Sequence, residues 1–378
     1  MRVLSRRVHV PFAVTSVRRR HPGCPAPTGL RETGRVSTPP LRLGTRASAL
    51  ATTQSGTVAR RLEELLDRPV ELVHITSQGD ADRTTPLASL GGAGVFVAAL
   101  REALLDDRCD IAVHSLKDLP TAQPDELRIV SPEREDPRDA LCARDGRTLD
   151  TLPRGGRVGT GSPRRAAQLR AARPDLDVVD IRGNVGTRLA RALGDDADLD
   201  AVVLAFAGLA RLERTDVVSE LLDPLVVAPA PGQGALAVEA RTADLAADAE
   251  LARAFAALDH RPTRLAVTAE RAVLARLEAG CSAPIGAYAR LEDGALALAA
   301  VVSRVDGTEQ LSHTARVEIA SHVTDDDADP AAYDLGVRVA ERLLADGAAR
   351  LAELMAAPAP TTAGADRVPT GTDDPEGP

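Results

Sequence analysis

Aromatic residues are nearly absent from this 378-residue chain, at 2% with no tryptophan. Aromatic platforms that stack nucleic-acid bases are therefore not expected. The formal net charge of −9 at pH 7 also argues against a protein that coats nucleic acid or an anionic membrane. No apolar run approaches the roughly 18 residues of a membrane-spanning helix, so no membrane segment is predicted.

Cysteine is scarce too, with four residues and no Cys-x-x-Cys spacing. We predict neither a metal site nor a disulfide framework, which fits a reducing cytoplasm. Cys109 and Cys142 fall in strand patterns, where an inert buried thiol is expected. Cys281 lies instead in the turn of LEAGCSAPIG (277–286). It is either another buried cysteine or an accessible thiol for covalent chemistry.

Lysine occurs once, as Lys117 in the stretch AVHSLKDLP (112–120). Apart from Lys117, every residue counted as lysine or arginine is arginine. Asp118 follows directly, and a cation beside a carboxylate at the end of an apolar strand is typical of active sites. His114 is equally consistent with a core residue at the strand end.

The two ends of the chain differ in composition from the rest. Residues 1–38 carry eight arginines against one acid, Glu32. We expect a disordered extension or a start codon assigned too early, with a transit-like targeting peptide as the alternative. Residues 357–378 are rich in Pro, Thr, Gly and Asp and predict a disordered tail.

Between these ends, strand and helix patterns alternate from residue 41 to residue 206, which predicts a parallel α/β layout in two lobes. After Phe255 the pattern changes and predicts a smaller α+β domain. Its expected elements are a long helix (262–279), two strands (295–303 and 310–318) and a final helix (331–355).

Polar residues recur at the ends of the predicted strands, where ligands bind in open parallel sheets. In GTGSPRR (159–165), Ser162 suits the N-cap and Pro163 the first helical position. In RGNVGTR (182–188), Asn184 suits a second cap, and Ser48 beside Arg46 gives a further example. Each motif alone also fits an ordinary cap beside solvated arginines. Together they imply a ligand with several carboxylates, since arginine binds carboxylates through two parallel hydrogen bonds.

Ten stretches together resemble the porphobilinogen deaminase (hydroxymethylbilane synthase) family over roughly residues 40–355, in the family's order. They are LGTRAS, TPLASLGGAGVF, AVHSLKDLP, REDPRDA, GTGSPRR, RGNVGTR, AGLAR, PGQGA, TAERA and EAGCSAPIG.

The resemblance implies a fold of the α/β class, with two lobes like those of type II periplasmic binding proteins and a small C-terminal α+β domain. The lobes would have parallel-type sheets and be joined by two crossovers. We place lobe 1 at residues 39–133 plus 234–252, lobe 2 at 138–229, and the cofactor-attachment domain at 256–356.

The resemblance also implies a transferase of tetrapyrrole, porphyrin and heme biosynthesis. It would join four porphobilinogen molecules head to tail on a covalent dipyrromethane primer, losing ammonia at each condensation. Water would then release hydroxymethylbilane. Cys281 would hold the dipyrromethane as a thioether, and Asp118 would be the catalytic carboxylate.

Other positions match residues that bind the cofactor and substrate in the family. They are Arg46, Ser48, Gln54, Phe96, Ser115, Lys117, Thr160, Ser162, Arg164, Arg165, Arg182, Asn184, Arg188, Arg211 and Gln233. Three positions depart from the family's pattern: Ser89 and Ala93 stand where many members carry lysines of a lid loop, and Gly161 replaces a serine.

We expect a cytoplasmic monomer that binds no nucleic acid and no membrane. A transient hand-off of its product to uroporphyrinogen-III synthase is a further expectation. The alternative is a non-catalytic two-lobe binding protein for a polycarboxylate ligand. That interpretation predicts a signal peptide or a DNA-binding domain, and it leaves Cys281 and Asp118 unexplained.

Overall fold

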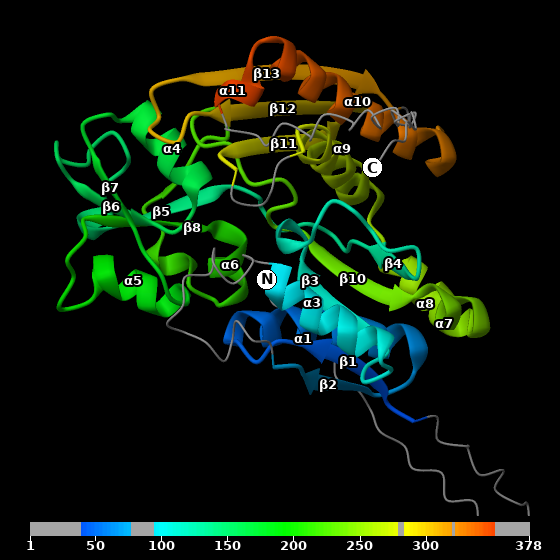
Figure 1. The fold of residues 1–378 in the computed structure, drawn as a ribbon. Helices are drawn as coiled ribbons and strands as arrows, with labels where there is room; N and C mark the ends of the chain where they lie inside the picture. Colours follow the sequence, from blue (N-terminus) through cyan, green and yellow to red (C-terminus); the bar gives the residue numbers. More distant parts are fainter. Residues whose placement is uncertain (1–38, 77–93, 279–282, 320–321, 352–378) are drawn as a thin grey trace, which may run out of the picture. The chain divides into compact units, whose positions relative to one another are not determined.

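The computed structural model describes residues 39–76, 94–278, 283–319 and 322–351, with backbone alone in residues 94–96. In this part of the chain the strands form three sheets, two of five strands and one of three (Figure 1). The predicted α/β class is confirmed, because two mixed sheets with helices on both faces precede a small α+β domain. None of the described helices has the length and apolar character that crossing a membrane requires.

The first sheet has the strand order β2-β1-β3-β10-β4. Strands β1, β2 and β3 are parallel, whereas β10 is antiparallel to both of its neighbours. The strands are β1 (Leu41–Thr45), β2 (Val70–His74), β3 (Ile111–Ser115), β4 (Leu127–Val130) and β10 (Leu236–Arg241).

Helices cover both faces of this sheet because alternate strand residues point to opposite sides. Ile111 and Val113 share one apolar cluster with residues of α1 (Ala49–Leu66) and α8 (Ala249–Ala257). Ala112 belongs to another, with residues of α3 (Gly94–Leu105). A short helix, α7 (Thr242–Ala247), follows β10.

The second sheet has the order β7-β6-β8-β5-β9. Helix α4 packs on one face through Leu169 and α5 on the other through Leu189. The elements are β5 (Asp139–Ala143), β6 (Arg157–Thr160), α4 (Pro163–Ala172), β7 (Asp177–Asp180), α5 (Val185–Leu193), β8 (Ala201–Ala205), α6 (Phe206–Arg211) and β9 (Glu220–Leu221).

The parallel-type sheets that were predicted each contain a strand of opposite direction, β5 in one and β10 in the other. Strand β5 pairs antiparallel with β8, with Asp139 opposite Ala205, and β10 pairs antiparallel with β3, with Leu236 opposite Ser115. Both strands therefore start at the carboxyl end of a parallel neighbour. The chain enters each sheet from a crossover at that end, so it has to run back against the parallel strands.

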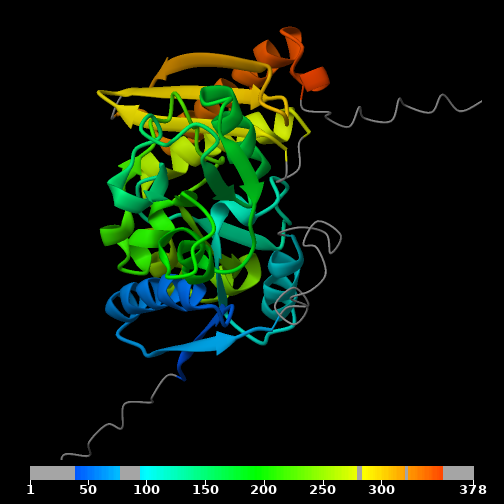
Figure 2. The ribbon, with the colours of Figure 1, turned by 90° about the vertical axis from the view of Figure 1, so that its left-hand side faces the viewer.

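The C-terminal domain has an antiparallel sheet in the order β11-β12-β13, drawn yellow to orange in Figure 2. Two predicted strands, β12 (Ala295–Ser303) and β13 (Gln310–Glu318), are confirmed. Strand β11 (Ile285–Glu292) was missed because its buried side chains are mostly alanine, which gives a weak apolar alternation. The helices are α9 (Arg261–Arg276), α10 (Asp325–Ala345) and α11 (Ala348–Leu351).

The two crossovers, residues 131–138 and 222–235, touch each other between the lobes. Glu135 donates its backbone N–H to the carbonyl of Gly234 at 3.3 Å. Gln233 donates through Nε2 to the carbonyl of Pro137 at 2.7 Å. Gly234 has φ +87°, and a Cβ there would lie 2.4 Å from the oxygen of Glu135, so only glycine allows this approach.

A buried ion pair joins the crossovers to the C-terminal domain. Arg134 donates to both carboxylate oxygens of Glu270 on α9, at 2.7 and 3.0 Å. Arg134 also donates to the carbonyl of Gln233, while Glu270 accepts the N–H groups of Gly232 and Ala289. The side chain of Glu270 is fully buried and that of Arg134 is 9% exposed, so this pair is well satisfied away from water.

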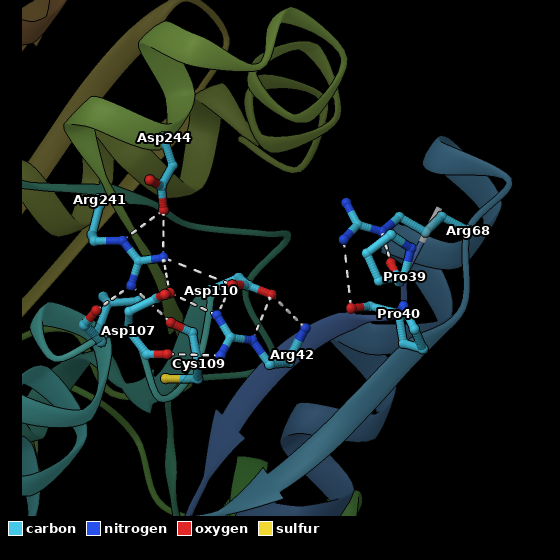
Figure 3. Close-up of polar contacts among 10 residues, drawn as sticks. Pro39, Pro40, Arg42, Arg68, Asp107, Cys109, Asp110, Arg241 and Asp244 are labelled. Atoms are coloured by element: carbon cyan, nitrogen blue, oxygen red, sulfur yellow. Dashed lines mark hydrogen bonds and ion pairs between the residues drawn. The ribbon is translucent and has the colours of Figure 1, made fainter. Parts of the chain in front are cut away.

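A second polar network fixes the far end of the first sheet (Figure 3). Arg42 on β1 binds Asp110 at 2.6 Å and Asp107 at 2.7 Å. Arg241 at the end of β10 binds Asp244 at 2.6 Å and the carbonyl of Cys109 at 2.9 Å. These contacts hold the returning strand β10 in register and leave the opposite, carboxyl end of the sheet for other residues.

Replacing Glu270 by alanine should lower the free energy of unfolding by about 3–5 kcal/mol, because the buried guanidinium of Arg134 loses its carboxylate. Urea denaturation measures this loss. The control is Arg316→Ala, which breaks an exposed pair with Glu318 and should cost less than about 1 kcal/mol. Equal losses in the two variants would contradict the assignment.

Candidate active site

A cavity of about 300 Å³ lies at the carboxyl ends of the parallel strands in both lobes. This is where open α/β sheets bind ligands. Among the described residues that line it, Asp118 is the one carboxylate against five cations. The predicted site residues that the structure brings together here are Arg46, Ser48, Gln54, Ser115, Lys117, Asp118, Arg165, Arg188 and Arg211.

Lys117 and Asp118 reach the cavity from a tight turn. Strand β3 ends at Ser115 and continues as the 3₁₀ turn η1 (Leu116–Asp118). Leu116 and Leu119 are buried, at 2% and 1% exposure, and anchor the turn on the side away from the cavity. The half-buried Lys117 and Asp118 between them line the cavity.

Hydroxyl and amide groups complete the first-lobe side of the cavity. Ser48 is the N-cap of α1, as predicted, and accepts the N–H of Ala51 at 3.3 Å. Gln54, one turn further along α1, donates to Ser115 Oγ at 3.3 Å. This bond links α1 to the end of β3, directly before the turn that carries Asp118.

The second lobe supplies two arginines that are largely shielded from water. Arg188 on α5 donates through Nε to the carbonyl of Gly183 at 2.8 Å. Arg211 at the end of α6 donates to the carbonyl of Gly234 at 2.6 Å. Burial lowers the pKa of both guanidinium groups, which nevertheless stay charged. Each guanidinium has five N–H donors and these bonds use one, so donors remain for an anionic ligand.

Asp139 at the start of β5 neutralises two adjacent arginines. It accepts from Arg164 at 2.8 Å and from Arg165 at 3.0 Å, and its side chain is fully buried. Gln233 donates to the same carboxylate at 2.7 Å. Burial alone would raise the pKa of Asp139, but the two arginines and Gln233 lower it to about 2.

Several predicted binding residues lie outside the cavity lining. Arg164 is buried, and its guanidinium binds Asp139 and the carbonyl of Ala228, so it supports the wall behind Arg165. The others lie at helix starts or in the crossover. Thr160 accepts the N–H of Ser162, and Ser162 and Asn184 are the N-caps of α4 and α5, as predicted. Arg182 is largely exposed and lies near Asp180. Gln233, in the crossover, contacts both Lys117 and Arg165.

Some predictions fall outside the described residues. These are Cys281, the side chain of Phe96, and the positions Ser89 and Ala93. The described chain before Cys281 ends with α9 and a turn in which Glu278 has φ +51°, and β11 begins at Ile285. Cys109 and Cys142 are buried free thiols, as predicted, and burial raises the pKa of both, that of Cys142 to about 12.

His114 proves to be a core residue. Its Nε2 lies 3.0 Å from a carboxylate oxygen of Glu239, and the side chains of both residues are almost completely buried. Asp139 was not among the predicted site residues, although it lies in the stretch REDPRDA (134–140). The sequence signal that was available is an acidic residue in a chain rich in arginine motifs. Only the fold shows that Asp139 binds both Arg164 and Arg165.

Lys117 is the most perturbed cation of the cavity. Its Nζ lies 3.5 Å from Gln233 Oε1. Burial lowers the pKa of Lys117 to about 8, with Arg165 acting in the same direction and Asp118 opposing it. The ammonium group is therefore charged at neutral pH and loses its proton a little above it.

Comparisons with known proteins show which family the chain resembles. The model of "Porphobilinogen deaminase, dipyromethane cofactor binding domain" matches residues 41–249, and that of "Porphobilinogen deaminase, C-terminal domain" matches residues 264–345. The porphobilinogen deaminase of Cutibacterium acnes is 56% identical over 332 residues, covering 84% of this chain and 98% of its own. That of Micrococcus luteus is 53% identical over 353 residues, covering 82% and 93%.

Solved structures give a much weaker similarity. The alkanesulfonate-binding protein SsuA from Xanthomonas axonopodis pv. citri is 17% identical, with a TM-score of 0.31, over 62% of this chain and 73% of that chain.

The low pKa of Lys117 predicts a pH-dependent stability. The unfolded chain keeps this proton up to pH 10.5, whereas the folded chain releases it near pH 8. The unfolded state then binds more protons between these values, so the wild-type protein should gain stability relative to Lys117→Met as pH rises from 8 to 10.5. Urea denaturation of both proteins at several pH values tests this. A difference that stays flat or falls would contradict it.

Proposed function

Because this chain belongs to the porphobilinogen deaminase family, we propose that Asp118 is the catalytic acid and base of its reaction and that Cys281 carries its cofactor. The protein is a transferase of tetrapyrrole biosynthesis that condenses porphobilinogen to hydroxymethylbilane, with dipyrromethane as cofactor. The observation that carries the proposed site is Asp118, which among the described lining residues is the one carboxylate beside five cations, in a cavity shared by both lobes.

The lining of the cavity fits a group such as dipyrromethane, whose pyrrole rings bear acidic side chains. Arg46, Arg188 and Arg211 offer guanidinium donors for carboxylates, and the residues between them include the apolar Leu50, Leu204 and several alanines and glycines. Charge-assisted bonds of this kind contribute about 1.5–3 kcal/mol each. When bound, the dipyrromethane supplies the free pyrrole position that accepts the first substrate unit.

Asp118 is placed to handle protons and positive charge in turn. In its acid form it protonates the amine that leaves porphobilinogen as ammonia. The resulting carboxylate then stabilises the cation left on the substrate and accepts the proton that the new bond displaces. One carboxylate serves all these steps because the substrate returns it to its starting protonation state in each cycle.

The cations around Asp118 hold the acidic side chains of the substrate and of the growing chain. Hydrogen bonds to Asp139 and Gln233 fix the orientation of the Arg165 guanidinium. Arg188 and Arg211 are each oriented by one bond to a main-chain carbonyl. The compact ammonium of Lys117 stands next to the acid and is held at its other side by Gln233. Preset donors of this kind lose little entropy when the ligand binds.

We further propose the domain boundaries given above, since β10 returns to the first sheet after the second crossover. A cytoplasmic location is supported by the buried free thiols Cys109 and Cys142, which fit a reducing compartment. The protein would act as a monomer and pass its product to uroporphyrinogen-III synthase. Sedimentation tests the first point, since a stable dimer would refute it.

A non-catalytic binding protein for a polycarboxylate would share the fold and the cationic cavity. It would not need a carboxylate among the cations, because Asp118 weakens the binding of any anion. The two activities are separated by turnover of porphobilinogen, which a binding protein lacks.

Intact masses of the wild-type protein and Cys281→Ser should differ by two pyrrole units beyond the Cys-to-Ser change. The thioether needs this sulfur, so the variant cannot hold the dipyrromethane. Cys142→Ala is the matched control, a buried cysteine whose loss should leave the added mass in place. Equal added mass in Cys281→Ser would refute the attachment site.

Asp118→Asn should lower kcat by a factor on the order of 10²–10⁴, because the amide neither donates an acidic proton nor balances a cation. KM for porphobilinogen should change far less, since the arginines remain. Asp216→Asn, at an exposed position in the second lobe, is the control and should keep wild-type kcat. A wild-type kcat in Asp118→Asn would refute the proposed role.

A further inference from the structure

Arg271, on helix α9 of the C-terminal domain, binds the turn that carries Asp118. Its guanidinium donates to the carbonyls of Leu116 at 3.3 Å, Leu119 at 3.1 Å and Pro120 at 2.5 Å. These three carbonyls flank Lys117 and Asp118 on both sides. A residue distant in sequence, from another domain, therefore holds both ends of the turn.

The same face of α9 also provides the apolar seat of this turn. Val267 lies one helical turn before Arg271, so both side chains point to the same side. Val267 packs in one cluster with Leu116 and Leu119, the two buried residues that anchor the turn. The turn thus rests on α9 through apolar contacts and is fixed in direction by the guanidinium.

Few other backbone bonds fix this turn. Leu119 donates its N–H to Leu116 within the turn, at 3.1 Å, and Leu116 donates to the carbonyl of Ala235 at 3.0 Å. The second bond holds the start of the turn, whereas Arg271 also holds its exit. Rotation of so short a turn would carry the carboxyl group of Asp118 with it.

We propose that Arg271 is a positioning residue of the reaction, which acts by fixing the direction of Asp118 through the carbonyls of Leu116, Leu119 and Pro120. This inference rests on the proposed role of Asp118. The bonds from Arg271 to this turn go to main-chain carbonyls, not to the carboxyl group of Asp118. Helix α9 of the C-terminal domain thereby also sets the orientation of the acid.

Two neighbouring residues of α9 make two different contacts. Glu270 binds the crossovers through Arg134 and Gly232, and Arg271 binds the acid's turn. The contact of Glu270 holds the crossovers between the lobes, and the contact of Arg271 holds the turn that carries the proposed catalytic carboxylate. Loss of Arg271 should therefore affect catalysis more than global stability.

The test compares Arg271→Ala and Arg271→Lys with the wild-type enzyme and with Arg276→Ala, a control on the same helix whose exposed side chain pairs with Glu341. Displacement of a catalytic group by about 1 Å can cost about 100-fold. We expect kcat to fall 10- to 100-fold in Arg271→Ala, with KM within about threefold. Arg271→Lys, which keeps the charge but not the fork, should recover part of the loss, and Arg276→Ala should match the wild type.

The decisive step repeats Arg271→Ala in an Asp118→Glu background. If Arg271 acts through Asp118, Arg271→Ala should lower the kcat of the Asp118→Glu enzyme by less than about threefold, because the longer carboxylate has already lost its alignment. A double variant whose loss in kcat equals the product of the two single-variant losses would refute the proposal. A wild-type kcat in Arg271→Ala would refute it as well.

Amide hydrogen exchange tests the geometry without any turnover. In Arg271→Ala, faster exchange should be confined to residues 115–121. Unchanged exchange there would overturn the proposal. If the wild-type protein failed to turn over porphobilinogen while this local change still appeared, the proposed function would fail and the structural contact would stand.

Discussion

The buried ion pair between Arg134 and Glu270 is the contact on which the arrangement of this protein depends. It joins the first crossover, the second crossover and the C-terminal domain at one point, with its polar atoms satisfied by main-chain groups. An ion pair of this kind contributes little to net stability compared with an apolar core of equal size, but breaking it is costly. Its effect is to specify one way of joining three bodies that each have their own core.

The electrostatics of the cavity balance binding against stability. Asp139 satisfies Arg164 and Arg165, so these arginines can be buried without a ligand. Lys117 has no such partner at close distance, and burial lowers its pKa to about 8. The folded protein therefore keeps an excess of positive charge in the cavity, which a ligand with several carboxylates would relieve. Functional sites often break the rules of stable cores in this manner.

Local patterns in the sequence predicted the elements that local chemistry determines. Ser48, Ser162 and Asn184 were identified as caps because their side chains bind main-chain N–H groups nearby. Strands β5 and β10 were not assigned an antiparallel direction, since direction depends on where a crossover enters the sheet.

The site shows the same limit. Arg164 and Arg165 are adjacent and were predicted to act alike, yet only Arg165 lines the cavity, since successive helical residues point about 100° apart. Arg271 lies in the quoted stretch TAERA, but nothing in that stretch indicated its role, because its partners are main-chain carbonyls about 150 residues away.

The presence of one lysine in the whole chain has a practical consequence. Protein produced with isotopically labelled lysine would carry the label at a single side chain, inside the cavity and beside the acid. Its magnetic resonance signal would need no assignment among competing residues. The sequence thus supplies its own spectroscopic reporter, and each round of chain growth could be followed at the proposed site.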